Sequence, residues 1–199
     1  MTPLRAFLYG ATVAISIGPI AMLIINRSLT RGFIHGIRAG FGAALGDLFF
    51  AVISFTVGGS LVGILQDRSN SIQVFSSWIL IGLGLYLIFR ALHNYHHKRT
   101  ISPKQSPEVE IASVFLLTLS NPLSIIGFIG LIGQVPDHNP LSQSLILALS
   151  VFLGSLPIQL GIATAASLLH KFFQNPKAIL TLNILSGLGI MSFGVSYFL

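Results

Sequence analysis

Long apolar runs, separated by short polar connections, repeat along the whole chain. They cover approximately residues 6–26, 39–65, 72–92, 111–133, 142–169 and 178–199. Each run is long enough to cross a hydrocarbon core of about 30 Å as a helix. None alternates as the strand of a barrel does, and open sheet edges cannot face lipid. The pattern therefore predicts an all-α membrane protein that crosses the lipid bilayer with six transmembrane helices.

The composition agrees with a membrane protein and argues against a nucleic acid partner. Hydrophobic residues make up 53% of the 199 residues and charged residues only 8%, whereas a soluble domain has about 25% charge. The formal net charge is +6, but the basic residues sit in short connections between apolar runs, where they set topology. We therefore expect no nucleic acid partner. The chain has no cysteine, which excludes disulfides and thiolate metal sites.

The distribution of Lys and Arg predicts the orientation in the membrane. Cytoplasmic connections carry the excess of these residues, and here the first, third and fifth connections hold Arg27, Arg31, Arg38, Arg90, Lys98, Arg99, Lys104, Lys171 and Lys177. The opposite side has only Arg5 and Arg68. We therefore expect a multi-pass protein of the cell (inner) membrane with both termini outside the cytoplasm. The first run lacks a small-residue cleavage pattern, so we expect it to be retained.

A polar, basic cytoplasmic linker, 93–110, divides the chain into two three-helix halves, 1–92 and 111–199. The halves resemble each other at three places in the same order. Ile81–Phe89 aligns with Ser186–Gly194, Gly18-Pro19 with Asn121-Pro122, and Gly46-Asp47 with Gly154-Ser155. Such matches are typical of an internal duplication. Because three helices cross the membrane an odd number of times, the second half must be inverted, as in many secondary transporters.

Two prolines fall near the middle of predicted spans. Proline breaks or kinks a helix unless it lies in the first turn, and Gly18 before Pro19 and Asn121 before Pro122 both suit the position that caps a new helix. We therefore predict that the first and fourth helices are interrupted. The alternative is that both prolines only kink the helices for packing.

In two inverted halves, the half-helices after the two prolines would point their positive N-terminal ends at the bilayer midplane. Unpaired amides and helix dipoles there favour an anion such as a carboxylate. The candidate site residues at these interruptions are Ser16, Gly18, Pro19, Ser120, Asn121 and Pro122.

Asp47 is the only acidic residue well inside a predicted span. It lies nine residues beyond Arg38, roughly 13 Å along a helix, and an unpaired carboxylate at that depth is costly. Small residues at helical spacings from it let another helix approach closely; they are Gly40, Ala43, Ala44, Ala51, Ser54 and Gly58. We therefore expect Asp47 to face the bundle. It could carry a coupling proton, pair with a substrate ammonium group or cap a broken helix.

The remaining polar candidates are less distinctive. Gln159 and Asn183 lie in the fifth and sixth runs, where a lone amide more often forms an interhelical hydrogen bond than a ligand contact. His93, His96 and His97 could bind a metal, but they sit in a basic stretch without a nearby carboxylate. We interpret them as solvated histidines and expect neither a metal site nor a cofactor.

The sequence is similar to the lysine-exporter (LysE/RhtB) family of small translocators. The similarity rests on Ile15-Ser16-Ile17-Gly18-Pro19, on Ser28-Leu29-Thr30-Arg31-Gly32-Phe33, on Gly36, Gly40 and Asp47, and on Thr118-Leu119-Ser120-Asn121-Pro122. Ile17 stands where the family element has its first proline, and Leu123 stands where a lysine is common. The resemblance implies export of amino acids or similar small metabolites, driven by a proton or sodium gradient.

The residues point to a similar activity. The carboxylate of a zwitterionic amino acid suits the two half-helix ends, and its ammonium group suits Asp47. No nucleotide-binding loop is present, so rocking of one half against the other is the expected mechanism. Glycine-rich apolar faces also permit a homodimer.

Three other functions compete with this one. A divalent metal cation exporter would need several hard or imidazole ligands, and only Asp47 is charged within the predicted spans. An intramembrane enzyme would need an Asp pair, a Ser/His dyad or a His-Glu-x-x-His site, and none occurs within those spans. A structural subunit would not need a buried carboxylate between two broken helices. We therefore expect a transporter and not an enzyme.

Overall fold

The described residues fold into eight helices without a strand. A computed structural model of the 199-residue chain describes residues 1–15, 18–57, 69–96, 106–132, 140–170 and 175–195. The helices are α1 (Pro3–Ile15), α2 (Pro19–Arg31), α3 (Phe33–Val57), α5 (Ser69–His96), α6 (Pro107–Leu119), α7 (Pro122–Ile132), α8 (Leu141–Leu168) and α9 (Pro176–Val195). This all-helical architecture is consistent with the predicted all-α membrane protein.

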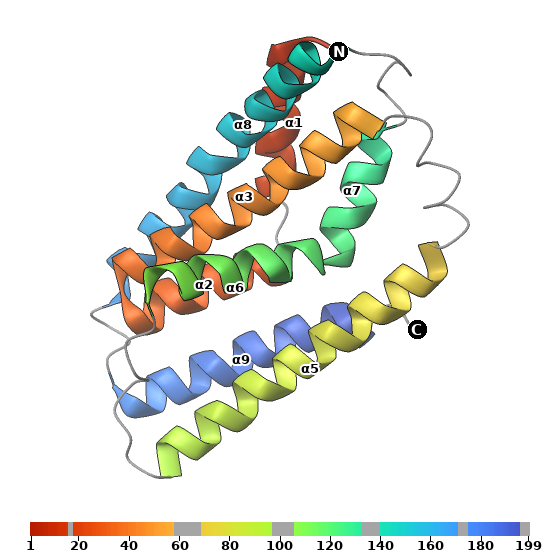
Figure 1. Cartoon of the computed structure of the whole chain (residues 1–199). Coiled ribbons are helices and arrows are strands. Elements are labelled where there is room, and N and C mark those ends of the chain that lie inside the picture. Colours follow the sequence, from red (N-terminus) through yellow and green to blue (C-terminus); the bar gives the residue numbers. More distant parts are fainter. Residues whose placement is uncertain (16–17, 58–68, 97–105, 133–139, 171–174, 196–199) are drawn as a thin grey trace.

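The chain breaks before both midspan prolines, as the sequence predicts. α1 and α2 are bent by 67°, and Gly18 between them has an extended backbone with Pro19 in the first turn of α2, where proline has no amide to lose. α6 ends at Leu119, and α7 begins at Pro122 and runs off at a steep angle (Figure 1). Ser16 lies outside the described residues.

α3 and α8 pack against each other at the centre, and each also packs against a broken helix of the other half. α3 contacts α6, while α8 contacts α1. Glycines permit the α1–α8 approach, because a Cβ added at Gly10 would lie 2.0 Å from the Val151 carbonyl oxygen, and one at Gly154 would lie 2.0 Å from that of Phe7. These four helices form part of the walls of the site described below, together with α2 and α7.

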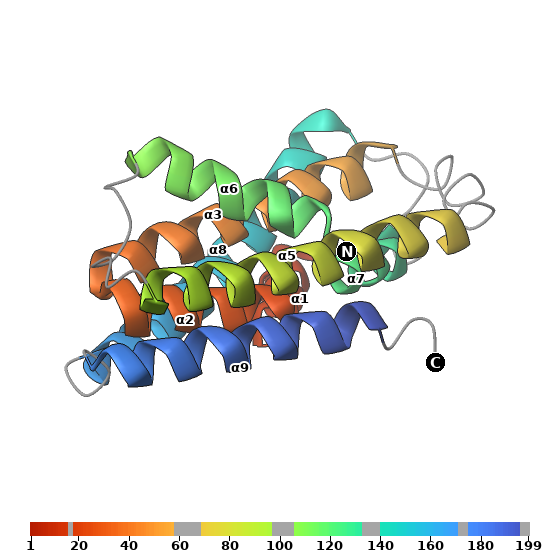
Figure 2. The same ribbon diagram turned by 90° about the horizontal axis from the view of Figure 1, so that it is seen from below.

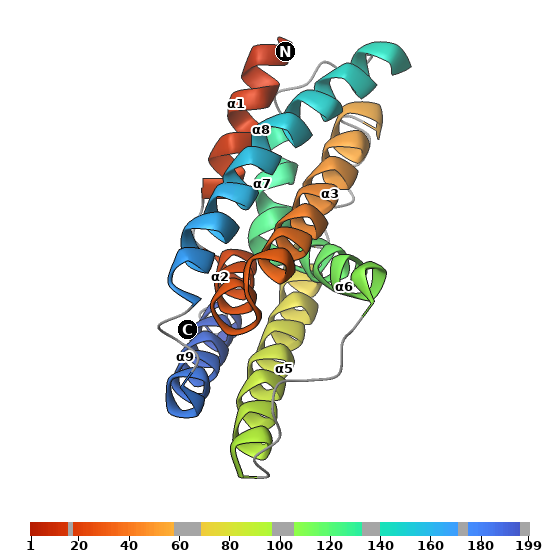
Figure 3. The ribbon, with the colours of Figure 1, turned by 90° about the vertical axis from the view of Figure 1, so that its left-hand side faces the viewer.

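α5 and α9 form a separate antiparallel pair. The two lie side by side in all three views (Figures 1, 2 and 3). Gly84 and Gly187 face each other across this contact, since a Cβ added at Gly84 would lie 2.5 Å from the Gly187 carbonyl oxygen. The pair adjoins the rest of the bundle mainly through α2 and α9.

Two of the described helical segments, Phe33–Thr56 and Leu141–Leu168, are long and apolar enough to cross a membrane by themselves, and α1 with α2 could form a third span. Ser77–His93 and Lys177–Ser192 are shorter apolar segments. The arrangement of six spans in two inverted repeats therefore stays a prediction, whereas the apolar helices of a membrane protein are observed.

The linker is shorter than the sequence suggests. α5 continues to His96 and α6 begins at Pro107, so both ends of the expected linker 93–110 are helical. His93 and His96 therefore belong to α5 and not to a loop, while His97 lies outside the described residues. Helix α6 begins early because Ser106 caps it, accepting a hydrogen bond from the Val109 amide, and Pro107 occupies its first turn.

Candidate functional site

A cavity of about 170 Å³ lies where the two chain breaks meet α3 and α8. Its apolar side comes from α1 and α2, and its polar side comes from α3, α6, the second break, α7 and α8. The lining residues are Val13, Ala14, Gly18, Ile20, Ala21, Asp47, Thr118, Asn121, Ser124, Gly127 and Gln159. Residues far apart in the sequence thus surround one space inside an apolar bundle.

Asp47 faces this cavity and has only neutral partners. Its side chain is 2% exposed. Ser155 of α8 donates a hydrogen bond to Asp47 Oδ2, and Gln159 Nε2, one turn further, donates a second over 3.4 Å. Arg31 and Arg38 pair with Glu110 instead. The prediction that Asp47 points into the bundle is confirmed, and no cation of the described residues pairs with its carboxyl group.

Asn121, at the second break, has an unused acceptor. Its Nδ2 donates to Ser124 Oγ over 3.0 Å, but its Oδ1 is buried and has no hydrogen-bond partner among the described residues. A buried acceptor without a partner is costly, and Asn121, the residue that carries it, lines the cavity. It is therefore available to accept a hydrogen bond from a ligand.

The start of α2 supplies donors to the same space. The Met22 amide is the first to bond within the helix, to the Gly18 carbonyl oxygen at 3.1 Å. Gly18 provides no side-chain cap, so the amides of Ile20 and Ala21, which precede Met22, have no acceptor within the helix. Both residues line the cavity. Helix-start amides and an acidic side chain therefore adjoin one cavity.

Four of the nine predicted site residues line the cavity, two begin the half-helices beside it, two lie elsewhere, and Ser16 is outside the described residues. Gly18, Asp47, Asn121 and Gln159 line it, and Pro19 and Pro122 begin the adjoining half-helices.

Ser120 ends α6, and its hydroxyl donates to the Leu116 carbonyl oxygen of its own helix over 3.1 Å. Asn183 accepts a hydrogen bond from Asn26 Nδ2 over 3.3 Å and thereby joins α9 to α2. Both contacts are structural. The Ser120 hydroxyl bonds to its own helix, and the Asn183 amide links α9 to α2.

Sequence reasoning missed several hydroxyl groups of the site. Thr118 and Ser124 line the cavity, and the Tyr9 hydroxyl donates to the carbonyl oxygen of Gly127, a lining residue. Ser155 was matched to Asp47 by the internal similarity, but nothing in the pattern indicated that the two would touch. Hydroxyl residues are common in apolar helices, so no sequence signal separated these from the others.

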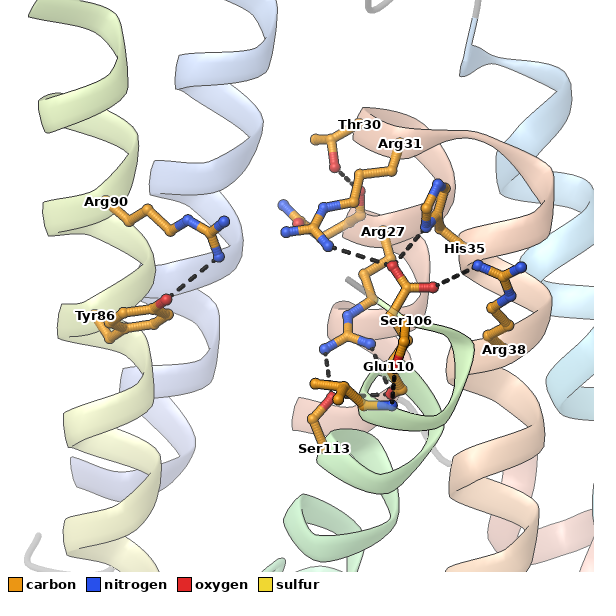
Figure 4. Close-up of polar contacts among 12 residues, drawn as sticks. Arg27, Thr30, Arg31, His35, Arg38, Tyr86, Arg90, Ser106, Glu110 and Ser113 are labelled. Atoms are coloured by element: carbon orange, nitrogen blue, oxygen red, sulfur yellow. Dashed lines mark hydrogen bonds and ion pairs between the residues drawn. The ribbon is translucent and has the colours of Figure 1, made fainter. Parts of the chain in front are cut away.

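A second polar cluster surrounds Glu110 at the far ends of α2 and α6 (Figure 4). Glu110 Oε1 lies 2.6 Å from His35 Nδ1 and 3.6 Å from Arg31 Nη1, while Oε2 accepts from Arg38 Nη1 over 3.0 Å. Arg27 donates to the Glu110 carbonyl oxygen over 3.1 Å and to Ser113 Oγ over 3.0 Å. We call Glu110, Arg27, Arg31, His35 and Arg38 the Glu110 cluster.

Glu110 is fully buried, although the sequence places it in the linker. Burial acts to raise the pKa of its carboxyl group, but hydrogen bonds from Arg38 and His35 outweigh it and hold the pKa below the usual value. Glu110 is therefore a carboxylate at neutral pH. Its basic partners lie more than 70 residues earlier in the chain, so periodicity alone could not assign them.

The described residues contain no group of three or more His, Asp or Glu side chains that could hold a metal ion. His93 instead stacks on Phe89 of the same helix, with ring centroids 6.2 Å apart. The chemistry offered by the Asp47 cavity is thus recognition of a small polar molecule by a carboxyl group, an amide oxygen and helix-start amides.

Comparison with known proteins identifies the relatives of this chain. Residues 11–199 match the family described as LysE type translocator. The chain is 25% identical over 190 residues to "Putative amino acid efflux protein YcgF" of Bacillus subtilis (strain 168), covering 93% of this chain and 89% of that protein. It is 26% identical over 194 residues to the uncharacterized membrane protein slr1627 of Synechocystis sp. (strain ATCC 27184 / PCC 6803 / Kazusa), covering 94% and 92%. No solved structure matches the chain significantly.

Proposed function

Because the chain belongs to the LysE type translocator family, we propose that it exports amino acids or related small metabolites through the Asp47 cavity. The observation that carries the proposal is a buried carboxyl group whose partners among the described residues are neutral, beside helix-start amides, in one cavity. Members of this family are transporters and not enzymes. The name of the Bacillus subtilis relative, with its reference to amino acid efflux, supports the same substrate class.

A zwitterionic amino acid suits the charges of the cavity. The substrate carboxylate binds at the Ile20 and Ala21 amides, where the positive end of α2 favours an anion. The ammonium group lies against Asp47 and the unpartnered Asn121 Oδ1. Binding the substrate thus gives a partner to polar groups that are otherwise buried without one.

The volume of the cavity limits the size of the substrate. An apolar cavity of about 150 Å³ in another protein holds benzene, a molecule of six carbon atoms. The Asp47 cavity, at about 170 Å³, therefore accommodates a small amino acid in this conformation. Larger side chains require α1 or α2 to move.

A proton is the coupling ion that fits the surroundings of Asp47 best. A carboxyl group held by Ser155 and Gln159 alone can gain or lose a proton without breaking an ion pair. Sodium would need several oxygen ligands around the same position. We therefore propose antiport of substrate against protons, with Asp47 binding the substrate ammonium group and the proton in turn.

Alternation between the two sides follows from the proposed inverted repeats. The half-helices that start at Pro19 and Pro122 belong to different repeats, and rocking of one repeat against the other exposes the cavity first to one side of the membrane and then to the other. The end of the molecule rich in arginine lies in the cytoplasm by the charge rule, and the chain spans the inner membrane.

A ligand screen tests this function. The purified protein is heated with each amino acid, and separately with divalent cations, at two pH values, and the shift in melting temperature is recorded. A small amino acid should stabilise the protein, and the Asp47→Asn variant should lose the pH dependence of this shift. Stabilisation by divalent cations but by no amino acid would overturn the proposal in favour of metal export.

A further inference from the structure

We propose that the Glu110 cluster is a gate that closes the basic end of the molecule against the Asp47 cavity. The inference rests on the proposed transport function and adds a positioning residue, Glu110, that lies outside the cavity. It is drawn from three observations: where the cluster lies, which helices it joins, and what closes the space between it and the cavity.

The cluster and the cavity lie at opposite ends of the same helices. α2 leads from Pro19 at the cavity to Arg31 in the cluster, and α6 leads from the cluster back toward Asn121. Each of these helices has 13 residues, which is about 20 Å. α3 carries both Arg38 and Asp47, roughly 13 Å apart along the helix. A route from the basic end to the cavity must therefore pass between α2, α3 and α6.

Tightly packed side chains close that route. A buried apolar layer between the cluster and the cavity consists of Ile20, Leu23, Ile24, Ala39, Ala43, Val114 and Ala163. The backbones also approach closely, because a Cβ added at Gly42 of α3 would lie 2.5 Å from the Ile111 carbonyl oxygen of α6. Opening the route requires α6 to move away from α3.

Glu110 holds α6 in the closed position. The carboxylate is on α6, whereas its basic partners Arg31, His35 and Arg38 are on α2 and α3 (Figure 4). Arg27 adds two hydrogen bonds from α2 to the first turns of α6. α6 begins the second predicted repeat, and α2 and α3 belong to the first. The cluster therefore joins the two parts that must separate when the repeats rock.

Charged groups at the edge of a bundle suit a contact that must open repeatedly. A buried ion pair gains little net free energy over its separated, hydrated ions, because burial removes water from both partners. When the gate opens at the basic end, water would hydrate both charged partners again. Without the carboxylate, Arg27 and Arg31 of α2 and Arg38 of α3 would repel one another where these two helices meet α6. Glu110 thus determines how often the gate opens.

The absence of cysteine from the chain allows a direct test with single cysteines. Ala21→Cys places a thiol in the cavity wall, and a membrane-impermeant maleimide is supplied from the basic end of the reconstituted full-length protein. Glu110→Gln in this background should raise the labelling rate about tenfold, the effect of losing a hydrogen bond to a charged group. Glu108→Gln removes an exposed carboxylate from the same turn and should leave the rate unchanged.

Two further variants separate gating from loss of structure. Ala148→Cys, fully buried in the core between α1, α3 and α8, should stay unlabelled with Glu110→Gln if the fold is intact. If Glu110→Gln does not fold, Arg38→Gln, which removes one hydrogen bond, should still raise the labelling of Ala21→Cys. Unchanged labelling of Ala21→Cys in the folded variants, or equal labelling of Ala148→Cys, would overturn the gate.

The test needs no substrate, so its outcome is independent of the proposed function. Faster labelling supports the gate even if amino acids do not stabilise the protein, in which case the substrate assignment alone fails. Stabilisation by an amino acid together with unchanged labelling keeps the exporter and rejects the gate.

Discussion

Ser155 donates a hydrogen bond to Asp47 although 108 residues separate them in the chain. The internal similarity of the sequence aligns the two residues, and they lie on the two central helices, Ser155 on α8 and Asp47 on α3. Their contact lies where these central helices pack together, next to the cavity. A polar pair at this position links the stability of the bundle to the state of the carboxyl group.

Replacement of Asp47 tests its role in transport. Asp47→Asn keeps the size of the side chain and can still hydrogen-bond to Ser155, so we expect folding and membrane insertion to be retained. It removes the negative charge and the exchangeable proton, so gradient-driven export from reconstituted vesicles should fall to the level of empty vesicles. Glu108→Gln serves as the control with normal export. Full export by Asp47→Asn would remove this residue from the mechanism.

The hydrogen bond from Ser155 should contribute to stability. Ser155→Ala leaves Asp47 with Gln159 as its only described donor, and we expect the free energy of unfolding to fall by about 1–3 kcal/mol. Ser150→Ala, in the same helix, removes an exposed hydroxyl that bonds only to Ile146 of its own helix. It should change the melting temperature little. Equal effects of the two substitutions in detergent would argue against a stabilising Asp47 contact.

The close approach of α1 and α8 should not tolerate a larger residue. Gly154→Ala would place a Cβ 2.0 Å from the Phe7 carbonyl oxygen, so the helices must move apart, at a cost of about 1–3 kcal/mol. A Cβ at Gly161, seven residues later in α8, meets nothing within 4 Å. Gly161→Ala should therefore be neutral or stabilise the helix by up to about 1 kcal/mol. Thermal unfolding of both variants provides the comparison.

The chain breaks should matter for substrate binding. Pro19→Ala combined with Pro122→Ala allows the first and fourth helices to become continuous, which would pair the helix-start amides within the helix. Affinity for the amino acid found in the ligand screen should then fall. Pro157→Ala, within the continuous helix α8, is the control and should bind normally. Unchanged affinity of the double variant would leave the two prolines with a packing role only.

Replacement of Asn121 should weaken substrate binding more than it changes the stability of the fold. Asn121→Leu deletes a buried acceptor that has no partner but also the hydrogen bond to Ser124, so we expect the free energy of unfolding to change by no more than about 1 kcal/mol. Binding of the substrate should weaken about tenfold, because the ammonium group loses a hydrogen-bond acceptor. Isothermal titration or thermal shifts at increasing substrate concentration measure this change. A variant that binds as the wild type does would exclude Asn121 from the site.

The sequence by itself determined the helical class, the two breaks and the inward direction of Asp47. These features depend on local chemistry. Long apolar runs must satisfy their backbone groups within a helix, proline is best accommodated in the first turn of a helix, and a carboxyl group in an apolar run avoids lipid. Each consequence follows from neighbours a few residues away, and the structure places all three as expected.

Only the tertiary structure decided which polar groups meet. From the sequence, Glu110 is interpreted as a linker residue. In the structure, α6 packs against α2 and α3, and the Glu110 carboxylate contacts arginines that lie 72 or more residues earlier in the chain. Ser155 and Asn183 are equally unremarkable in sequence, yet one touches Asp47 and the other joins α9 to α2. Such contacts depend on the rotation and crossing of whole helices, which the packing of many side chains fixes together and no single segment encodes.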